Sequence, residues 1–153
     1  MHIIIDSREQ LPLSFSGWSD INTSVAALPT GDYSLLGLHD KIAVERKTLV
    51  DIVNCFSGTE RDRFERELSR GRGLDYFAVV IEASYAEMEA RKYRSKLSPS
   101  QALKVLLDLQ VRYNASFIWA GNRRAAEFIT HWLLKSYLNQ ATENYNYILS
   151  SHG

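Results

Sequence analysis

Residues 31–51 read GDYSLLGLHDKIAVERKTLVD, a pair of short apolar segments joined by a turn. Asp32 stands at the edge of the first segment, and Glu45 and Lys47 lie on the second. Alternate side chains of an extended strand share one face, so Glu45 and Lys47 are predicted to project together. A turn over residues 37–40 would pair the segments as a hairpin and bring Asp32 beside that face.

Two carboxylates beside an ammonium group are the side chains that metal-dependent phosphodiester hydrolysis requires. Carboxylate oxygens are hard ligands that hold Mg²⁺, and a lysine can orient or activate a water near a phosphate. Asp32 and Glu45 are therefore candidate metal ligands, and Lys47 is a candidate catalytic residue. The plainer interpretations are that Asp32 is a turn residue and that Glu45 and Lys47 form a solvated cross-strand face.

The same residues resemble the signature of a known family. GDY at residues 31–33, followed by VERK at residues 44–47 and by Asp51, is similar to the GDx(n)ERKx₃D signature of the XPF/Mus-type structure-specific nucleases. That family belongs to the PD-(D/E)xK, restriction-endonuclease-like superfamily. The run IIIDSRE at residues 3–9 also resembles the family's first strand, which ends in D-x-R-E. The complete string is a far more specific signal than an isolated D…ExK triplet.

The resemblance implies an α/β fold in which a mixed central sheet is flanked by helices on both faces, and the predicted order of elements agrees. It implies a Mg²⁺- or Mn²⁺-dependent endodeoxyribonuclease that acts on branched or otherwise structured DNA in repair or recombination. Implied partners are such DNA, including single-strand/double-strand junctions, and a second nuclease domain in a homodimer or heterodimer. The alternatives are a restriction-like or resolvase nuclease and a catalytically inactive DNA-binding or dimerisation module. The intact Asp32, Glu45 and Lys47 argue against the inactive module.

Three further residues of the matching segments are candidate site residues with competing interpretations. Arg46 points to the face opposite Glu45 in an ideal strand, where it would support the carboxylates or contact phosphate. Asp51 belongs to the family's active-site cluster, yet Thr48 and Asp51 also match a helix capping box. Asp6 is placed to join the metal site or to hold a basic residue of the ERK run, and its plainer role is a strand-end turn. The candidate catalytic residues are Asp32, Glu45, Arg46, Lys47 and Asp51, and the candidate metal ligands are Asp32, Glu45 and Asp6.

Basic residues are unevenly distributed along a chain that has no net charge. Eighteen Lys and Arg balance eighteen Asp and Glu, so no overall basic field drives DNA affinity, and local patches must supply it. Arg61 departs from the family pattern in its neighbours, and the arginines around it could equally form a solvated helix face. The candidate DNA-binding residues are Arg8, Arg61, Arg63, Arg91, Lys92, Arg94 and Lys96.

Apolar periodicity and capping signals predict one domain over residues 1–140 and a polar C-terminal tail over residues 141–153. Helices are expected to begin at Thr48, Thr59, Ser84, Ser98 and Asn122. Strands are expected at residues 3–6, 23–27, 32–36, 41–47, 76–81 and 116–120. In the helix after Ser98, Leu103, Leu106, Leu107 and Gln110 are predicted to share one face.

The cysteine content and the N-terminal sequence predict an intracellular protein of the cytoplasm, nucleoid or nucleus. Cys55 is the only cysteine, which excludes an internal disulfide and a multi-cysteine zinc site. Met1-His2 leads directly into a strand-like run rather than into a signal peptide.

The last predicted helix carries an apolar stripe of Phe128, Ile129, Trp132 and Leu133, which is wider than one sheet face requires. The chain leaves no room for the helix-hairpin-helix domain that often follows this nuclease domain. We therefore expect a homodimer with a helix-mediated, mostly apolar interface. The alternative is that the stripe only covers the chain's own sheet.

Overall fold

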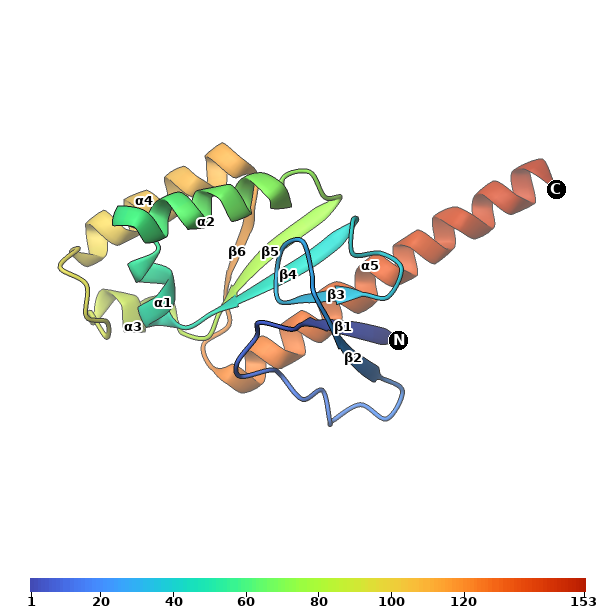
Figure 1. Cartoon of the computed structure of the whole chain (residues 1–153), viewed down its shortest axis with the longest axis horizontal. Coiled ribbons are helices and arrows are strands. Elements are labelled where there is room, and N and C mark those ends of the chain that lie inside the picture. Colours follow the sequence, from blue (N-terminus) through green and yellow to red (C-terminus); the bar gives the residue numbers. More distant parts are fainter.

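The protein, described by a computed structural model of residues 1–153, is built around one six-stranded sheet with the order β2-β1-β3-β4-β5-β6 (Figure 1). The strands are β1 (His2–Asp6), β2 (Asn22–Ala26), β3 (Tyr33–Leu35), β4 (Ile42–Lys47), β5 (Tyr76–Ile81) and β6 (Ser116–Trp119). The helices are α1 (Leu49–Asn54), α2 (Gly58–Gly71), α3 (Tyr85–Glu89), α4 (Pro99–Tyr113) and α5 (Arg123–His152).

The sheet is mixed, because β3 runs antiparallel to both of its neighbours. β1 pairs with β2 in parallel, and β4, β5 and β6 also pair in parallel. β3 joins the two halves through antiparallel pairs with β1 and with β4, where Tyr33 lies opposite Val44. The expected fold class is confirmed. β4 and β5 run parallel, so the carboxyl end of β4, which carries Glu45 and Lys47, lies at the same end of the sheet as the carboxyl end of β5.

Two hydrophobic cores lie on opposite faces of the sheet, and consecutive residues of β4 alternate between them. Ala43 packs with α1, α2 and α4 in one core, whereas Val44 packs with α5 and the loop after β1 in the other. Strands buried on both faces have nearly continuous apolar sequences, as β5 does. By the same alternation, Glu45 and Lys47 face the α2 side and Arg46 faces the α5 side.

Local sequence determines where the helices begin. The side chains of Thr48, Ser84, Ser98 and Asn122 each accept a hydrogen bond from a backbone N–H in the first turn, as their capping signals predict. Pro99 follows Ser98 at the first helical position, where its missing N–H costs nothing. The helix expected from Thr59 begins one residue earlier, at Gly58.

Two expectations about the helices are wrong. The inward face of α4 is formed by Ala102, Leu106 and Leu109, while Leu107 is 47% exposed, so the buried stripe is rotated from the predicted one. The expected polar tail over residues 141–153 is helical, since α5 continues to His152 and projects away from the body of the protein (Figure 1). None of the helices combines the length and apolar character that crossing a bilayer requires.

Candidate active site

The β3–β4 hairpin brings Asp32, Glu45 and Lys47 together, as the sequence predicted. The Asp32 N–H donates to the Val44 carbonyl at 2.9 Å, and the Arg46 N–H donates to Asp32 Oδ2 at 2.8 Å. Gly31 makes this close approach feasible, because its φ is +76° and a Cβ there would lie 2.8 Å from the Ala43 Cβ. The backbone thus clamps the Asp32 carboxylate beside the end of β4.

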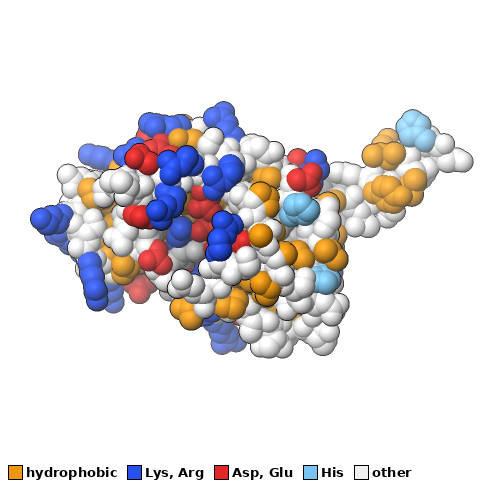
Figure 2. Space-filling view, viewed as in Figure 1, with side chains coloured by type: hydrophobic (Ala, Val, Ile, Leu, Met, Phe, Trp, Pro, Cys, Tyr) orange, Lys and Arg blue, Asp and Glu red, His pale blue; other side chains and the backbone are white.

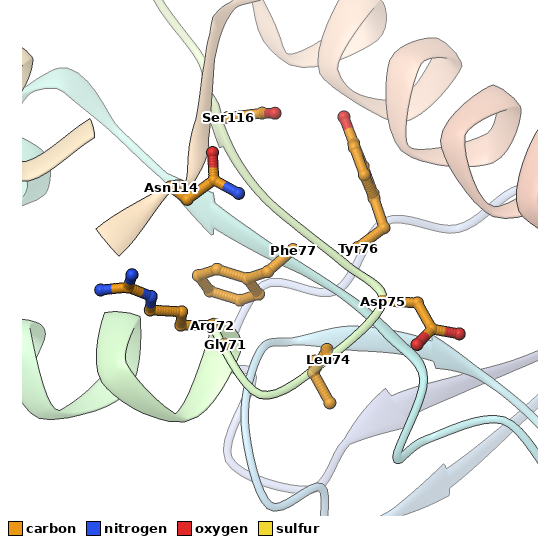
Figure 3. A pocket seen from close by; sticks show the side chains of 8 residues that line it. All are labelled: Gly71, Arg72, Leu74, Asp75, Tyr76, Phe77, Asn114 and Ser116. Carbon is orange, nitrogen blue, oxygen red and sulfur yellow. The ribbon is translucent and has the colours of Figure 1, made fainter. Parts of the chain in front are cut away.

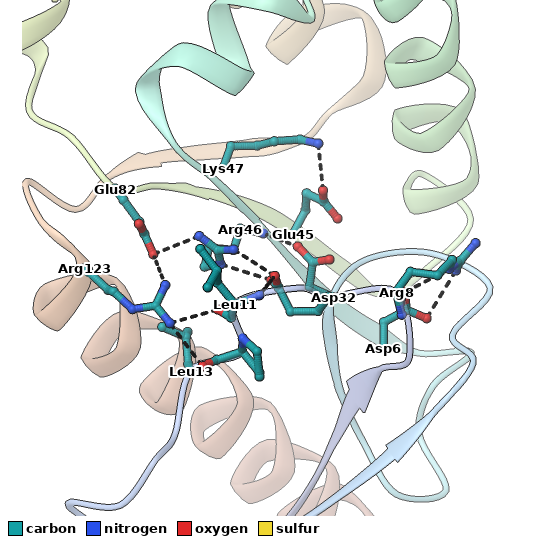
Figure 4. Close-up of polar contacts among 12 residues, drawn as sticks. Asp6, Arg8, Leu11, Leu13, Asp32, Glu45, Arg46, Lys47, Glu82 and Arg123 are labelled. Carbon is teal, nitrogen blue, oxygen red and sulfur yellow. Dashed lines mark hydrogen bonds and ion pairs between the residues drawn. The ribbon is translucent and has the colours of Figure 1, made fainter.

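A groove of about 260 Å³ opens over these residues at the carboxyl end of β4. Its lining combines residues of the hairpin, the loop after β1 and the start of α1, and only one lining residue is hydrophobic. The residues are Arg8, Glu9, Gln10, Leu11, Asp32, Glu45, Arg46, Lys47, Thr48 and Asp51. All five candidate catalytic residues therefore border a single polar groove. Figure 4 labels four of them, Asp32, Glu45, Arg46 and Lys47.

Glu45 and Lys47 form an ion pair inside the groove. Lys47 Nζ lies 2.9 Å from Glu45 Oε1, and both side chains are largely buried. Burial lowers the pKa of Lys47, but the attraction of Glu45 outweighs it, so that pKa lies above its ordinary value. Lys47 is consequently a protonated ammonium at neutral pH, which suits it to hold a water or an anionic oxygen and not to remove a proton.

The environment of Asp32 and Glu45 disfavours the charged form of both carboxyl groups. Burial raises the pKa of Asp32 to about 6, and nearby Glu9 and Glu67 add to that rise against the hydrogen bond from Arg46. Burial also raises the pKa of Glu45 well above its ordinary value, with further contributions from Glu67 and Asp32. Like charges confined together in a poorly solvated groove are stabilised by a cation.

Asp32 and Glu45 fit a divalent cation such as Mg²⁺. Their oxygens are hard donors, and burial, the main cause of their raised pKa values, leaves both carboxylates poorly solvated. No three His, Cys, Asp or Glu side chains form a ready-made metal-binding group in the structure. Mg²⁺ is commonly bound through one or two carboxylates and keeps several waters, so a pair of carboxylates is a sufficient protein contribution.

Arg46 points to the opposite face of β4 and is fully engaged there (Figure 4). Its guanidinium donates to both carboxylate oxygens of Glu9, at 3.0 and 2.8 Å, and to Glu82 at 3.1 Å. Arg123 of α5 also donates to Glu82 and to the carbonyls of Leu11 and Pro12. These charges are balanced within the protein, so Arg46 fastens the loop after β1 to the sheet and to α5.

Asp6 is not placed as the sequence predicted for a metal ligand. It does not line the groove, and its oxygens accept hydrogen bonds from the Arg8 guanidinium and from the backbone N–H groups of Arg8 and Leu28. Burial raises the pKa of Asp6, but these hydrogen bonds outweigh it and hold that pKa below its ordinary value. Asp6 therefore organises the loop and orients Arg8, which remains 73% exposed above the groove.

Asp51 serves as a helix-start residue and also borders the groove. Its N–H donates to Thr48 Oγ1 at 3.2 Å, and its side chain is exposed and makes no ion pair. Only the Thr48 half of the expected capping box is formed, and the carboxylate of Asp51 remains exposed at the groove.

The candidate DNA-binding residues fall into two classes. Arg61 is paired with Glu65 and lies 3.9 Å from Asp108, so helix contacts occupy it. Arg63 is 73% exposed and loosely paired with Glu60. The four basic residues of the α3–α4 loop are exposed and make no ion pairs: Arg91, Lys92, Arg94 and Lys96.

The sequence interpretation missed one acidic neighbour of the site, Glu67 of α2. Glu67 lies close enough to Glu45 and Asp32 for its charge to raise the pKa of both carboxyl groups. A signal was present, because Phe64 and Leu68 form the buried stripe of α2, and a carboxylate one turn beyond Phe64 lies beside it.

A second cavity, of about 270 Å³, lies at the opposite end of the parallel strands (Figure 3). Its lining includes Arg72, Asp75, Tyr76 and Asn114. Arg72 is bound to the Arg112 carbonyl, and Asp75 accepts a hydrogen bond from Tyr137 outside this cavity. This cavity has one carboxylate, Asp75, and therefore lacks the neighbouring carboxylates of the groove.

Comparison with known proteins agrees with this geometry. A family model described as the ERCC4 domain matches residues 5–131. The structure of XPF from Aeropyrum pernix is similar, with a TM-score of 0.70 and 20% identity, over 90% of this chain and 61% of that one. Its complex with DNA is similar with a TM-score of 0.68 and 20% identity, over 91% of this chain and 66% of that one. The chain thus spans less than two thirds of either structure, and the likeness shows a shared fold. No curated protein matches the sequence.

Proposed function

The chain belongs to the ERCC4 domain family, and on that premise we propose that it is a metal-dependent DNA endonuclease. The observation that supports this activity is the charge imbalance at the carboxyl end of β4. Asp32 and Glu45 are both drawn out of water and share one lysine, while the groove beside them remains open to solvent. Such a pair is stabilised by a divalent cation, and a bound cation would in turn attract the phosphate of a nucleic acid, as in a phosphodiester hydrolysis site.

Each groove residue has a part in the proposed reaction. Asp32 and Glu45 would hold Mg²⁺ or Mn²⁺, which supplies Lewis-acid polarisation of a phosphoryl oxygen. Lys47 keeps its proton and orients the attacking water or stabilises negative charge on the phosphate. Arg8 and Asp51 stand at the rim, where the guanidinium of Arg8 is held by Asp6 and the Leu28 carbonyl but stays exposed to an incoming phosphate. Arg46 acts indirectly, by holding the backbone whose N–H group fixes Asp32.

We propose that the bound nucleic acid is branched or junction-containing DNA. One face of the molecule shows acidic side chains in its middle, with Lys and Arg side chains around and above them (Figure 2). A cationic border around an acidic centre matches a phosphate backbone that crosses a cation site. The similar Aeropyrum pernix XPF has been seen in complex with DNA. The chain as a whole carries no net charge, so we expect modest affinity with strong salt dependence.

Cleavage assays test the proposal directly. Labelled flap, fork, four-way and linear DNA would be incubated with the protein, with Mg²⁺, Mn²⁺ or EDTA. We expect cleavage of one or more branched substrates that is lost in EDTA and in Glu45→Gln. Binding to DNA with no cleavage under any metal condition would instead identify an inactive module of the same fold.

We also propose that the protein forms a homodimer through the outer face of α5. Phe128 and Trp132 are 55% and 45% exposed and lie side by side, with ring centroids 6.2 Å apart. Further along the helix, Tyr145 and Ile148 are also exposed, at 61% and 56%. Exposed groups of large apolar side chains mark interaction sites. Sedimentation should give a dimer mass, and Trp132→Glu should give a folded monomer; a monomeric wild type would contradict the proposal.

A further inference from the structure

A second surface groove, of about 430 Å³, lies between α3 and α4. Its apolar lining comes from Tyr85 of α3 and from Leu103 and Leu107 of α4. Tyr85 and Leu107 are 40% and 47% exposed, so large apolar side chains stay open to solvent here. The ring of Tyr85 meets the ring of Trp119 edge-on, with centroids 6.2 Å apart, and this contact holds Tyr85 in place. The α3–α4 groove thus offers a fixed, exposed aromatic side chain.

This aromatic pair lies at the same end of the sheet as the candidate active site. Lys47 is opposite Ile81 in the β4–β5 pair, and Ile81 is opposite Trp119 in the β5–β6 pair. Residues opposite each other point to the same face, and neighbouring strands are about 4.8 Å apart, so the backbone of Trp119 lies about 10 Å from that of Lys47. Figure 1 shows α3 at this end of the sheet, together with α1, which begins just after Lys47.

Positive charge borders the α3–α4 groove. Lys104 is part of its lining and makes no ion pair, and Glu89 is the one acidic lining residue. Pro99 and Ser100 place the start of α4 at the groove, and the first turn of a helix attracts phosphate groups. The loop that joins α3 to α4 adds four exposed basic residues: Arg91, Lys92, Arg94 and Lys96.

We infer that the α3–α4 groove binds an unpaired segment of the DNA strand that enters the active site. Bases would stack on Tyr85 and contact Leu107, while phosphates would meet the basic residues around the groove. Only an unpaired strand exposes base faces to such side chains, so the groove would recognise the single-stranded arm of a branched substrate. The inference rests on the proposed nuclease function. At about 3.4 Å per nucleotide, the 10 Å from Lys47 corresponds to about three nucleotides of a stacked strand.

An amphipathic acidic peptide and a second copy of the chain are the competing occupants of the α3–α4 groove. Both could use its apolar lining, and the peptide could also use its basic border. The position of the groove favours DNA, because a strand bound at Lys47 extends beyond that residue and Trp119 lies within a few nucleotides of it. Neither competing occupant requires that the groove lie at the catalytic end of the sheet.

Fluorescence anisotropy with labelled oligo(dT), and with a duplex of equal length, tests the inference in EDTA, where binding is measured without cleavage. We expect Tyr85→Ala to weaken oligo(dT) binding by about fivefold or more and to leave duplex binding unchanged. The log–log salt slope should stay as in wild type, since the lost contact is not ionic. Tyr85→Phe keeps the ring and should bind as wild type does. Tyr147→Ala is the matched control, because it removes an exposed tyrosine near the far end of α5.

A second variant keeps the test decisive if Tyr85→Ala proves unstable in thermal unfolding. Leu107→Glu changes an exposed residue from α4 and places a negative charge in the α3–α4 groove, so it should also weaken oligo(dT) binding. If folded Tyr85→Ala and Leu107→Glu both bind oligo(dT) as the control does, the inference is wrong. Equal losses for oligo(dT) and duplex would also overturn it, because the groove would not select an unpaired strand.

Two further outcomes separate this inference from its alternatives and from the function on which it rests. If Leu107→Glu lowers the sedimenting mass of a dimeric wild type, a second copy of the chain covers the groove and the inference is wrong. If oligo(dT) binding depends on Tyr85 but no DNA is cleaved under any metal condition, strand binding by the groove is supported and the nuclease activity fails.

Discussion

The charged residues on the two faces of β4 differ in how completely they are paired, although Glu45, Arg46 and Lys47 are neighbours in sequence. On the α5 face, Arg46 is paired with Glu9 and Glu82, and nearly every oxygen has a donor. On the α2 face, Asp32 and Glu45 lie beside the single ammonium of Lys47, and burial raises the pKa of both carboxyl groups. The first arrangement satisfies its own charges, whereas the second has more carboxylates than cations.

This difference separates a structural network from a functional site. Buried ions that are fully paired are costly to break, since removing one partner leaves an uncompensated charge. Buried carboxylates that are not fully paired have raised pKa values and typically occur where catalysis or binding requires them. Because consecutive residues of β4 point to opposite faces, the fully paired charges lie on the α5 face and the incompletely paired carboxylates lie on the α2 face. Substitutions on the two faces should therefore affect different properties.

The largest effect is expected on catalysis from the α2 face. Asp32→Asn and Glu45→Gln remove a cation ligand, and Lys47→Ala removes the groove's positive charge, so each should reduce cleavage by about 1,000-fold. Circular dichroism should show that the fold survives. Lys47→Ala should retain most of the Mn²⁺ affinity. Asp40→Asn, an exposed carboxylate in the same hairpin, serves as the control. Wild-type cleavage by all three variants would refute the nuclease assignment.

Arg46→Ala is expected to reduce the stability of the fold, whereas the substitutions on the α2 face are expected to reduce cleavage. This variant leaves Glu9 and Glu82 buried without their shared cation, so the free energy of unfolding should fall by about 3–5 kcal/mol. Urea unfolding monitored by tryptophan fluorescence measures the change. Arg63→Ala, whose side chain is 73% exposed, should change the same quantity by less than about 0.5 kcal/mol. Equal effects of the two substitutions would show that the α5-face network contributes nothing to stability.

A smaller effect is expected on how the stability of the metal-free protein depends on pH, and its sign is unusual because stability should fall as pH rises. The pKa of Asp32 is raised from 3.8 to about 6 on folding, so the folded state binds more protons than the unfolded state between these values. Stability should therefore fall as pH rises from about 4 to about 6, by about 1–3 kcal/mol from this group.

Asp32→Asn removes that titration and supplies the control for it. The variant should show a flatter stability profile over this range and higher metal-free stability than wild type at pH 7. Thermal unfolding in EDTA across pH 4–7 measures both. A wild-type slope that persists unchanged in Asp32→Asn would assign the titration to another group.

The smallest effect is expected far from both faces of β4, in the exposed α3–α4 loop. Neutralising Arg91, Lys92, Arg94 and Lys96 should leave stability nearly unchanged, because the loop is held by Tyr93, whose hydroxyl donates to the Leu97 carbonyl at 2.8 Å. If the loop meets phosphates, DNA affinity should weaken, and its log–log salt slope should flatten by about one unit per lost contact. An unchanged salt slope would remove the loop from the DNA footprint.

Local sequence patterns determined where most helices begin and to which side of β4 its charged side chains point. Helix starts at Thr48, Ser84, Ser98 and Asn122 depend on interactions within one turn, so their side chains could be assigned without the fold. The pairing of Glu45 with Lys47, and the opposite direction of Arg46, follow from strand alternation. Asp32 could be placed because a short hairpin links it to β4. Each of these relations spans few residues and has few alternative geometries.

Only the tertiary structure decided which groups those side chains meet. Asp6 was expected near the metal, but the loop returning at Leu28 and the nearby Arg8 occupy its oxygens. The sequence leaves two roles open for Arg46, and the structure pairs it with Glu9 and Glu82. The packing of α2 on the sheet brings Glu67 close enough to raise the pKa of Glu45. Such contacts depend on how separate elements pack together, and that packing follows from the burial of both cores at once, which no local pattern in the chain encodes.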